Sequence, residues 1–526
     1  MKHLPFAFLL IAGLSTQAQS PLTGNPSELP FTLDMEEVTQ DELPGLHSGA
    51  FAQWDGWWVV IGGRIGGLHG FFPITGFPEN EANTTIWLIN PENGDLHNFP
   101  IDVLTVPFPD QLKSTNPQYV QDGDKLFICG GYGKEAASGN FVTFPILTAV
   151  QLPQLVSALI SGANPTAAFR QIQVSNLRVC GGEMDKLGDF FHLVGGHDFS
   201  GKYSDPNNGS FTQIYTNEIR KFKIHSTSSS LSISDYSAIK DEQNLHRRDF
   251  TLSPVLFPNG TPGLCLFGGV FRPNAALPYY NPVYITENQS VALDAQYEQL
   301  FSQYTCPTVP LFDSIDGSMY TLFFAGLSAH YFDLATQSIK YDARVPFIKD
   351  ITTFRRKADG SSQEFIMPAR FDALLGTNMI FAPVASAPHY ANEVLHFRQM
   401  SGKTFVGYLY GGIKAEIPNI TPSSANNRTF KVYLTPKLNS GTSSLAPSKR
   451  ATLRPNPLHR GENLVLETAF ELEEILLFSS DGRLLATFRQ SGQTLNQQLD
   501  FLLPGVYFLK LQGENQQETL RLVKMD

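Results

Sequence analysis

Charged side chains are scarce in this sequence, and the basic ones do not cluster. Asp, Glu, Lys and Arg make up 17% of the 526 residues, and the formal net charge is -11. The longest basic runs, Arg247-Arg248 and Arg355-Arg356-Lys357, fall short of the basic stripe that nucleic-acid binding requires. We therefore expect no nucleic-acid partner.

Cysteines are also few, and their spacing is not that of a zinc site. Cys129 and Cys180 stand directly before Gly-Gly pairs, and the other two are Cys265 and Cys306. We expect buried free thiols. Disulfide bridges are the alternative, because export would permit them. The sequence lacks the motifs of phosphate-binding loops, serine hydrolases and zinc proteases, and we predict no metal site, no cofactor and no catalytic residue.

Long apolar runs are missing as well. Beyond the N-terminus no stretch approaches 18 consecutive apolar residues, so we expect no integral membrane segment. The N-terminus has a basic start at Lys2, an apolar run over 4–14 and small residues around Ala18. This order is typical of a signal peptide, which we place at residues 1–18. The sequence thus predicts export through the inner membrane.

Glycine, proline and aromatic residues are abundant instead. The chain has 43 Gly, 35 Pro, 40 Phe and 18 Tyr, which favours many short strands joined by tight turns over a helical bundle. A change in composition near residue 437 divides the chain into a body at 21–436, a Ser- and Gly-rich linker at 437–450 and a tail at 451–526.

The body repeats one unit, a short apolar run that ends in two glycines. The copies span 57–63, 126–131, 190–196, 264–269 and 405–412, with a degenerate copy at 319–326. A run that is apolar at every position predicts a strand buried on both faces. The paired glycines predict a positive φ or a close backbone approach. Six units spaced by about 55–85 residues predict sheets arranged around an axis, which is a β-propeller.

The unit resembles that of the Kelch-repeat family, in which a later aromatic strand follows each Gly-Gly pair. Such strands are expected at 85–90, 218–222, 329–333 and 430–434, and a strand at 31–35 is expected to complete the last blade. The resemblance implies an all-β, Kelch-like propeller of about six blades. Gly181-Gly182 does not fit this register, and the long stretch between Gly326 and Gly411 leaves the blade count open by one.

In Kelch-like propellers the loops after Gly-Gly cluster on one face and often bind partners. Three of these loops are long here, at 64–82, 197–215 and 270–282. Aromatic and basic side chains on loops held by a rigid scaffold suit the recognition of a glycan or a protein. The alternative is that they only pack the loops against the ring. The candidate binding residues are Arg64, His69, Phe72, His197, Asp198, Tyr203, Arg272, Tyr279 and Tyr280.

The tail alternates short apolar runs with turn signals, which predicts a small β-sandwich. Its segments 455–457, 477–485, 504–510 and 521–524 resemble, in order, those of the type A sorting domain of the type IX secretion system of Bacteroidetes. The ending Lys524-Met525-Asp526 departs from that family, whose members often finish on a basic residue. The positions that carry the resemblance are Pro455, Asn456, Pro457, Asp481, Gly482, Pro504, Gly505, Tyr507, Lys510 and Lys524.

Together the two resemblances imply a protein that type IX machinery carries across the outer membrane, to be released or held at the cell surface. We expect a recognition protein that binds a glycan or a protein through the loops after Gly-Gly. One alternative is a secreted enzyme, either a glycan-active hydrolase or a metal-dependent oxidase, with its site in the propeller channel. Another is a structural surface protein without a discrete ligand. Carboxylates or histidines that converge on the channel would favour the enzyme.

Overall fold

The chain divides into two compact units, Met1–Leu438 and Asn439–Asp526. The computed structural model describes residues 23–38, 42–70, 75–203, 211–273, 275–287, 291–437, 451–479, 483–513 and 516–525. The expected signal peptide, and the expected linker apart from Lys437, lie outside these residues. Within the described ranges, no helix has both the length and the apolar character needed to cross a membrane.

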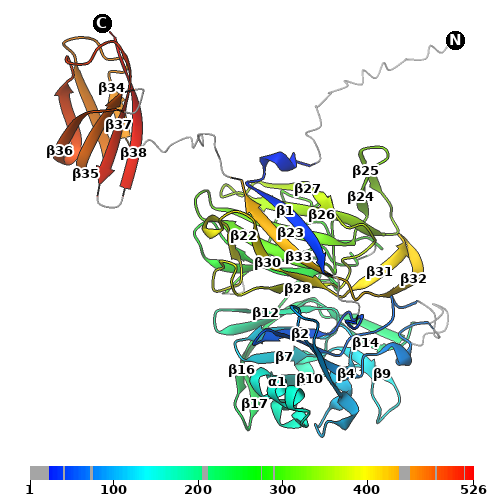
Figure 1. Ribbon diagram of the computed structural model, residues 1–526. Coiled ribbons are helices and arrows are strands. Elements are labelled where there is room, and N and C mark those ends of the chain that lie inside the picture. Colours follow the sequence, from blue (N-terminus) through cyan, green and yellow to red (C-terminus); the bar gives the residue numbers. More distant parts are fainter. Residues whose placement is uncertain are drawn as a thin grey trace, which may run out of the picture. The chain divides into compact units, whose positions relative to one another are not determined.

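The described part of the first unit contains six sheets of four or five strands, which are the blades of a propeller, and four two-stranded sheets (Figure 1). The inner strands of the first five blades contact one another in sequence. The strands of the first three blades, from the inner edge outward, are β2 (Ala50–Trp54), β3 (Trp57–Ile61), β4 (Thr85–Ile89) and β5 (Leu96–Pro100); β6 (Gln118–Asp122), β7 (Lys125–Cys129), β10 (Ile146–Gln151) and β11 (Phe169–Gln173); and β12 (Glu183–Leu187), β13 (Phe190–Val194), β16 (Glu218–Ser226) and β17 (Leu231–Lys240).

The other three blades follow the same plan, and the last is completed by the first strand of the chain. In blade 5 a short strand, β29 (Leu395–His396), also pairs in parallel with the inner strand. The strands are β18 (Thr251–Leu256), β19 (Pro262–Phe267), β20 (Val283–Thr286) and β21 (Val291–Leu293); β22 (Thr308–Asp313), β23 (Ser318–Leu327), β26 (Phe347–Arg356) and β27 (Ser362–Arg370); and β28 (Ile380–Pro383), β30 (Thr404–Tyr410), β33 (Thr429–Pro436) and β1 (Phe31–Val38).

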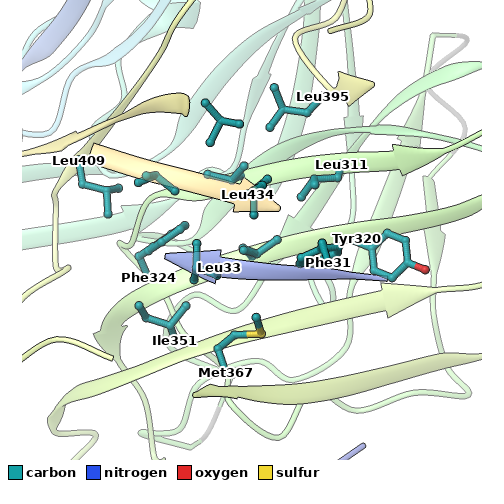
Figure 2. Close-up of a cluster of buried hydrophobic side chains, with 14 of the residues drawn as sticks. Phe31, Leu33, Leu311, Tyr320, Phe324, Ile351, Met367, Leu395, Leu409 and Leu434 are labelled. Carbon is teal, nitrogen blue, oxygen red and sulfur yellow. The ribbon is translucent and has the colours of Figure 1, made fainter. Parts of the chain in front are cut away.

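The predicted ring closure is confirmed by the pairing of β1 with β33. Phe31 lies opposite Pro436 and Val38 opposite Thr429, and Figure 1 shows the two strands side by side in blue and orange. Phe31 and Leu33 are buried in a core cluster with side chains of blade 5, as Figure 2 shows. The N-terminal strand therefore joins the two ends of the propeller sequence.

The core of the propeller consists of layers between neighbouring blades. Six clusters of buried apolar residues join blade 1 to 2, 2 to 3, and so on around to blade 6 and blade 1. In β3, Val59 and Ile61 belong to the layer toward blade 2, while Trp58 and Val60 belong to the layer toward blade 6. This confirms the prediction that the continuous apolar runs are buried on both faces.

The Gly-Gly pairs join each blade to the next at the end of these runs. A Cβ at Gly62 would lie 2.8 Å from the carbonyl oxygen of Leu112, and a Cβ at Gly63 would lie 2.3 Å from that of His47. Both glycines have positive φ, and the Gly63 N–H donates to the carbonyl of Ser114 at 2.8 Å. Positive φ and close backbone approach thus both apply, as the sequence predicted.

Three of the four expected later strands are third strands of blades, namely β4, β16 and β33. The prediction for 329–333 was wrong, because β24 (His330–Asp333) forms a separate hairpin with β25 (Ser338–Tyr341), and β26 is the third strand of blade 5. The described residues between Gly326 and Gly411 complete blade 5 and begin blade 6, so the propeller has six blades.

Hairpins follow the diglycine position in four blades. Besides β24 and β25, they are formed by β8 (Tyr132–Lys134) with β9 (Phe141–Thr143), β14 (His197–Gly201) with β15 (Phe211–Tyr215), and β31 (Ile413–Ile417) with β32 (Ile420–Ala425). Blade 2 also carries helix α1 (Leu152–Ser161), the only α-helix of the described residues. The short 3-10 turns are η1 (Pro26–Glu28), η2 (Glu79–Glu81), η3 (Ile101–Val103), η4 (Pro109–Lys113), η5 (Pro165–Ala168), η6 (Ser175–Leu177) and η7 (Phe397–Gln399).

The second unit is a small β-sandwich around its own core. Its strands are β34 (Ala451–Arg454), β35 (Asn463–Ser479), β36 (Leu484–Gln498), β37 (Gly505–Gly513) and β38 (Gln516–Lys524). The pairing of β35 with β36 shifts register between Glu467 and Leu472, so these long strands bend. Leu466 before the shift and Leu477 after it are buried in one cluster, which shows that both halves enclose the same core.

Candidate functional site

Each blade is preceded by a residue in the left-handed backbone region that lies at the propeller axis. These six residues, called the waist ring, have φ between 51° and 62° and are Ser48, Asn116, Gly181, Asp249, Thr305 and Asn378. The Asn116 N–H donates to the carbonyl of Ser48 at 2.9 Å, and the Asn116 carbonyl accepts from Gly181 at 3.1 Å. Two cavities share all six residues in their linings. The ring is therefore the waist of the central channel.

Gly181 belongs to this ring and Gly182 follows it, which explains why the pair does not fit the strand-ending register. A Cβ at Gly181 would lie 3.0 Å from Oδ1 of Asp249, and a Cβ at Gly182 would lie 2.6 Å from the carbonyl oxygen of Val194. Because Gly181 has no side chain, Nδ2 of Asn116 approaches Oδ1 of Asp249 at 3.5 Å across it. These glycines therefore lie at the start of the inner strand β12 and not at the end of a strand.

The cavity on the Gly-Gly side of the waist, called the upper cavity, has a volume of about 400 Å³. Each blade contributes two residues to it, one that precedes the waist residue and one that follows the diglycine position. Backbone hydrogen bonds join the two within each blade. In blade order the pairs are His47 and Arg64, Thr115 and Tyr132, Cys180 and His197, Arg248 and Val270, Tyr304 and Leu327, and Thr377 and Ile413.

Of the three arginines that line this cavity, Arg64 and Arg248 have largely buried side chains that are paired with carboxylates. Nη2 of Arg64, which is buried, donates to Oε2 of Glu81 at 2.8 Å. Burial lowers the pKa of Arg64, and the Glu81 contact partly offsets this. Arg248 pairs with Asp249, and its Nε donates to the hydroxyl of Tyr215 at 3.3 Å. Burial also opposes the charge on Arg248, but Asp249 holds its pKa above the usual value.

Three histidines of the cavity are held neutral. Burial, with the nearby Arg64, lowers the pKa of His47 to about 3. Burial lowers the pKa of His69 to about 4, and burial with Arg248 holds that of His197 well below its usual range. Nδ1 of His197 accepts from Nε2 of Gln213 at 2.7 Å, which leaves the ring proton on Nε2. At neutral pH these rings are hydrogen-bonding groups without charge.

Aromatic rings surround His69. Its ring centroid is 4.0 Å from that of Phe77 and 5.3 Å from that of Tyr203, and the interplanar angles are 25° and 15°. Phe77 packs in turn against Tyr132 and Phe199. The packing alternative therefore applies to much of this aromatic cluster, although His69 and Tyr203 also line the cavity.

The lining changes character around the ring. Blades 1 to 3 supply mainly polar residues, whereas the residues after the diglycine position in blades 4 to 6 are Val270, Leu327 and Ile413. Thr377 lies on the apolar side, is 1% exposed, and its hydroxyl makes no hydrogen bond with the described residues. The cavity thus has a polar wall and an apolar wall.

The structure brings four of the nine candidate binding residues into the upper cavity, namely Arg64, His69, His197 and Tyr203. Asp198 is half-buried beside His197 but is not part of the lining. Phe72 lies outside the described residues.

The three candidates in the loop after β19 pack against neighbours and do not line the cavity. The hydroxyl of Tyr279 donates to the carbonyl of Gln243 at 3.0 Å, and its ring lies 4.1 Å from the Arg247 guanidinium. The guanidinium of Arg272 lies 5.1 Å from the ring centroid of Tyr280. Sequence reasoning missed His47, Tyr132 and Arg248 instead. Their shared signal is a position beside the waist ring or the diglycine, repeated in every blade.

The cavity on the other side of the waist, called the lower cavity, has a volume of about 760 Å³ and is lined by the inner strands. Glu183 and Asp185 lie two residues apart in β12 and so on one face of that strand. Burial raises the pKa of Glu183 to about 8 and that of Asp185 to about 7. Nearby, Nζ of Lys186 pairs with Oδ2 of Asp122 at 2.7 Å. This cavity is acidic.

No group of three or more His, Cys, Asp or Glu side chains within the described ranges could hold a metal ion. The four cysteines are buried and free, as expected from the sequence. Burial raises the pKa of Cys180, which lines the upper cavity, to about 12. Its thiol is therefore protonated and unreactive at neutral pH.

In the second unit, several positions of the sorting resemblance hold its fold together. Asn456 donates to the carbonyl of Arg521 at 2.7 Å and accepts from the Val523 N–H at 2.9 Å. The hydroxyl of Tyr507 donates to the carbonyl of Leu503 at 2.7 Å. Nζ of Lys524, which is buried, donates to the carbonyl of His459 at 3.0 Å.

The other sorting positions are less constrained. Gly505 begins β37, and Lys510 lies within that strand opposite Thr519. The side chains of Pro455, Pro457 and Pro504 are exposed. Asp481 and Gly482 lie outside the described residues.

No family model matches the chain, and no curated protein matches it. A solved structure described as "Structure of YjhT" is similar over 75% of this chain and 99% of that chain, with 9% sequence identity and a TM-score of 0.39. The propeller assignment rests on the six sheets and their closed ring of core layers.

Proposed function

We propose that this protein is an exported recognition protein that binds a sugar unit of a glycan in the upper cavity. The observation that carries the proposal is the lining of this cavity, where all six blades place side chains around one recess of about 400 Å³. Small-molecule sites are commonly concave and of about 300–1,000 Å³. A protein partner instead needs about 800 Å² of surface on each side, which a recess of this size does not offer.

The polar wall suits hydroxyl groups. Arg64, Arg248 and the Nε2–H of His197 supply directed donors, and the backbone and side-chain partners of these residues fix their orientation. The rings of His69 and Tyr203 add flat surfaces that the apolar face of a sugar can contact. A sugar presents both kinds of surface, hydroxyl edges and C–H faces.

The upper cavity favours binding over hydrolysis. Among the described residues that line it, Asp249 is the only carboxylate, and it is paired with Arg248. Glycoside hydrolysis requires two carboxyl groups, one as an acid and one as a base or nucleophile. Burying polar groups costs free energy, and hydrogen bonds to a ligand in the recess would offset part of that cost.

A binding experiment with the purified full-length protein tests this function. Screening on a glycan array should identify a ligand, and His197→Phe should weaken its binding by about tenfold or more, because the Nε2–H donor is lost. His225→Phe is the matched control, since His225 is exposed on β16 of the same blade. The absence of any glycan ligand, or equal loss in both variants, would overturn the proposal.

We also propose that residues 1–18 are a signal peptide and that the tail, residues 451–526, directs export by the type IX secretion system. What supports this is the order of the four resembling segments and the separate compact fold of the second unit. A chain lacking 451–526, expressed in a host with type IX secretion, should accumulate in the periplasm while the intact chain reaches the medium or the cell surface. Equal export of both chains would contradict the sorting role.

A second candidate function, glycan hydrolysis, is favoured by one observation in the lower cavity. Burial raises the pKa of Glu183 to about 8 and that of Asp185 to about 7, so both carboxyl groups can hold or release a proton near neutral pH. The backbones of these two residues lie about 7 Å apart along the strand, and both residues line the lower cavity. Release of reducing sugar by the intact protein, lost in Glu183→Gln, would establish hydrolysis. No release from any glycan would exclude it.

A further inference from the structure

The charges around the upper cavity are balanced. Three arginines line it, and each pairs with one carboxylate: Arg64 with Glu81, Arg248 with Asp249, and Arg344 with Asp342. The only acid in the described lining is Asp249. The three lining histidines are neutral near pH 7, as described above. Counted with their ion-pair partners, the described residues of the lining therefore carry no net charge.

Paired arginines still offer hydrogen bonds to a ligand. Arg64 bonds to protein through Nη2, and Arg248 through Nε and Nη1. This leaves Nε and Nη1 of Arg64 and Nη2 of Arg248 without a partner among the described residues. A neutral hydroxyl can accept from these groups without breaking an ion pair. An anionic group would compete with Glu81 and Asp249 for the same arginines, and a cationic group would compete with the arginines for the same carboxylates.

The opposite wall selects for apolar surface. Val270, Leu327 and Ile413 are joined there by Phe271, Val345 and Phe347. A hydroxyl group placed against this wall would lose its hydrogen bonds to water, whereas a methyl group would gain from burial. The buried Thr377 hydroxyl makes no hydrogen bond with the described residues, and the same holds for the Thr305 hydroxyl and Oδ1 of Asn419, which also line the cavity.

From this geometry we infer that the upper cavity selects an uncharged sugar that carries an apolar substituent, such as a 6-deoxy sugar. The inference rests on the proposed binding function and names its ligand class. The hydroxyl edge of the sugar faces the paired arginines of blades 1 and 4, and the apolar substituent faces blades 5 and 6.

Calorimetry with matched methyl glycosides tests the inference on the full-length protein. For the galacto, gluco and manno series, the probes are the parent sugar, its 6-deoxy form and its uronic acid, which differ only at C6. In the series that binds, the 6-deoxy sugar should bind about fourfold more tightly than the parent, because one more apolar group is buried. The uronic acid should bind most weakly. Tightest binding by a uronic acid would overturn the inference but leave the binding function, whereas no binding by any probe would overturn both.

The charge argument has its own test in Glu81→Gln. This change leaves Arg64 without its counter-charge, so affinity for the uronic acid should rise by about tenfold, while affinity for the neutral sugars changes little. Glu79→Gln is the matched control, because Glu79 lies in the same turn η2 but pairs with Lys134 and does not line the upper cavity. An unchanged ratio of uronic acid to neutral sugar affinity in Glu81→Gln would contradict the role of charge balance.

Discussion

The two cavities of the propeller channel differ in how their charges are treated. In the upper cavity each arginine has a carboxylate partner and the histidines are neutral. In the lower cavity Glu183 and Asp185 share one strand face, and neither forms an ion pair within the described residues. The same six blades and the same waist ring build both ends. The fold therefore supplies the positions that line the channel, and the residue types at each level of the axis decide the chemistry of each cavity.

Removing the positive charge of Arg248 leaves the charges of the upper cavity unbalanced. Of the changes considered, it should cause the largest loss of stability. Arg248→Met leaves Asp249 half-buried without its counter-charge, which should lower the free energy of unfolding by about 3 kcal/mol. The measurement is denaturant unfolding followed by tryptophan fluorescence. All four tryptophans, Trp54, Trp57, Trp58 and Trp87, lie in the propeller, so the signal reports on this unit.

The control for this prediction is the double variant Arg248→Met with Asp249→Asn. Without the unpaired carboxylate, more than half of the lost stability should return, because the cost arises from the uncompensated charge. A double variant no more stable than the single one would show that lost packing, rather than charge, explains the effect.

In the lower cavity, removing a charge should stabilise the folded protein rather than destabilise it. The pKa of Glu183 is about 8 in the folded protein, above the usual value, so its stabilising contribution is complete at low pH and is lost as pH rises from about 4.5 to about 8. Glu183→Gln should therefore stabilise the propeller by about 1–2 kcal/mol at pH 9 and have little effect at pH 5. Unfolding of both proteins at the two pH values measures this.

Glu242→Gln provides the matched control, because Glu242 is an exposed residue paired with Lys240. Its effect should be small and should not increase with pH. A Glu183→Gln variant that destabilises the protein at pH 9 would show that the ionised carboxylate is favourable in the lower cavity.

The smallest effect is expected for Thr377→Val in the upper cavity. The substitution keeps the shape of the side chain and removes a buried hydroxyl that has no partner in the described part of the chain, so stability should change by less than about 0.5 kcal/mol. Binding of the sugar should nevertheless weaken. A loss of more than about 1 kcal/mol of stability would indicate a hydrogen bond to bound water within the ligand-free protein.

Much of the fold was predictable because its signals are local. Continuous apolar runs before Gly-Gly require burial on both faces, and six of them require a ring, which the blade layers confirm. Helix α1 was missed although Leu152, Leu155, Val156 and Leu159 form a buried stripe with helical spacing and Gly162 caps its end. The apolar residues around it in β10 masked this short pattern.

The errors concern features that depend on long-range pairing. The strand pattern at 329–333 is the same whether it pairs within a blade or in a hairpin, so the sequence could not separate the two. The sequence predicted part of the upper cavity, including Arg64 and His197, because these residues follow Gly-Gly pairs. His47 and Arg248 were missed because the positive φ of the following residue falls on different residue types, Ser48 and Asp249, so the repeated position is not visible as a sequence motif.

The most direct test of the whole account is a crystal structure of the protein with its tightest-binding glycan. The account predicts electron density for a sugar in the upper cavity, with hydroxyl groups at Arg64 and Arg248 and carbon atoms against Leu327 and Ile413. A sugar bound in the lower cavity beside Glu183 and Asp185, or on the outer surface of the blades, would contradict it.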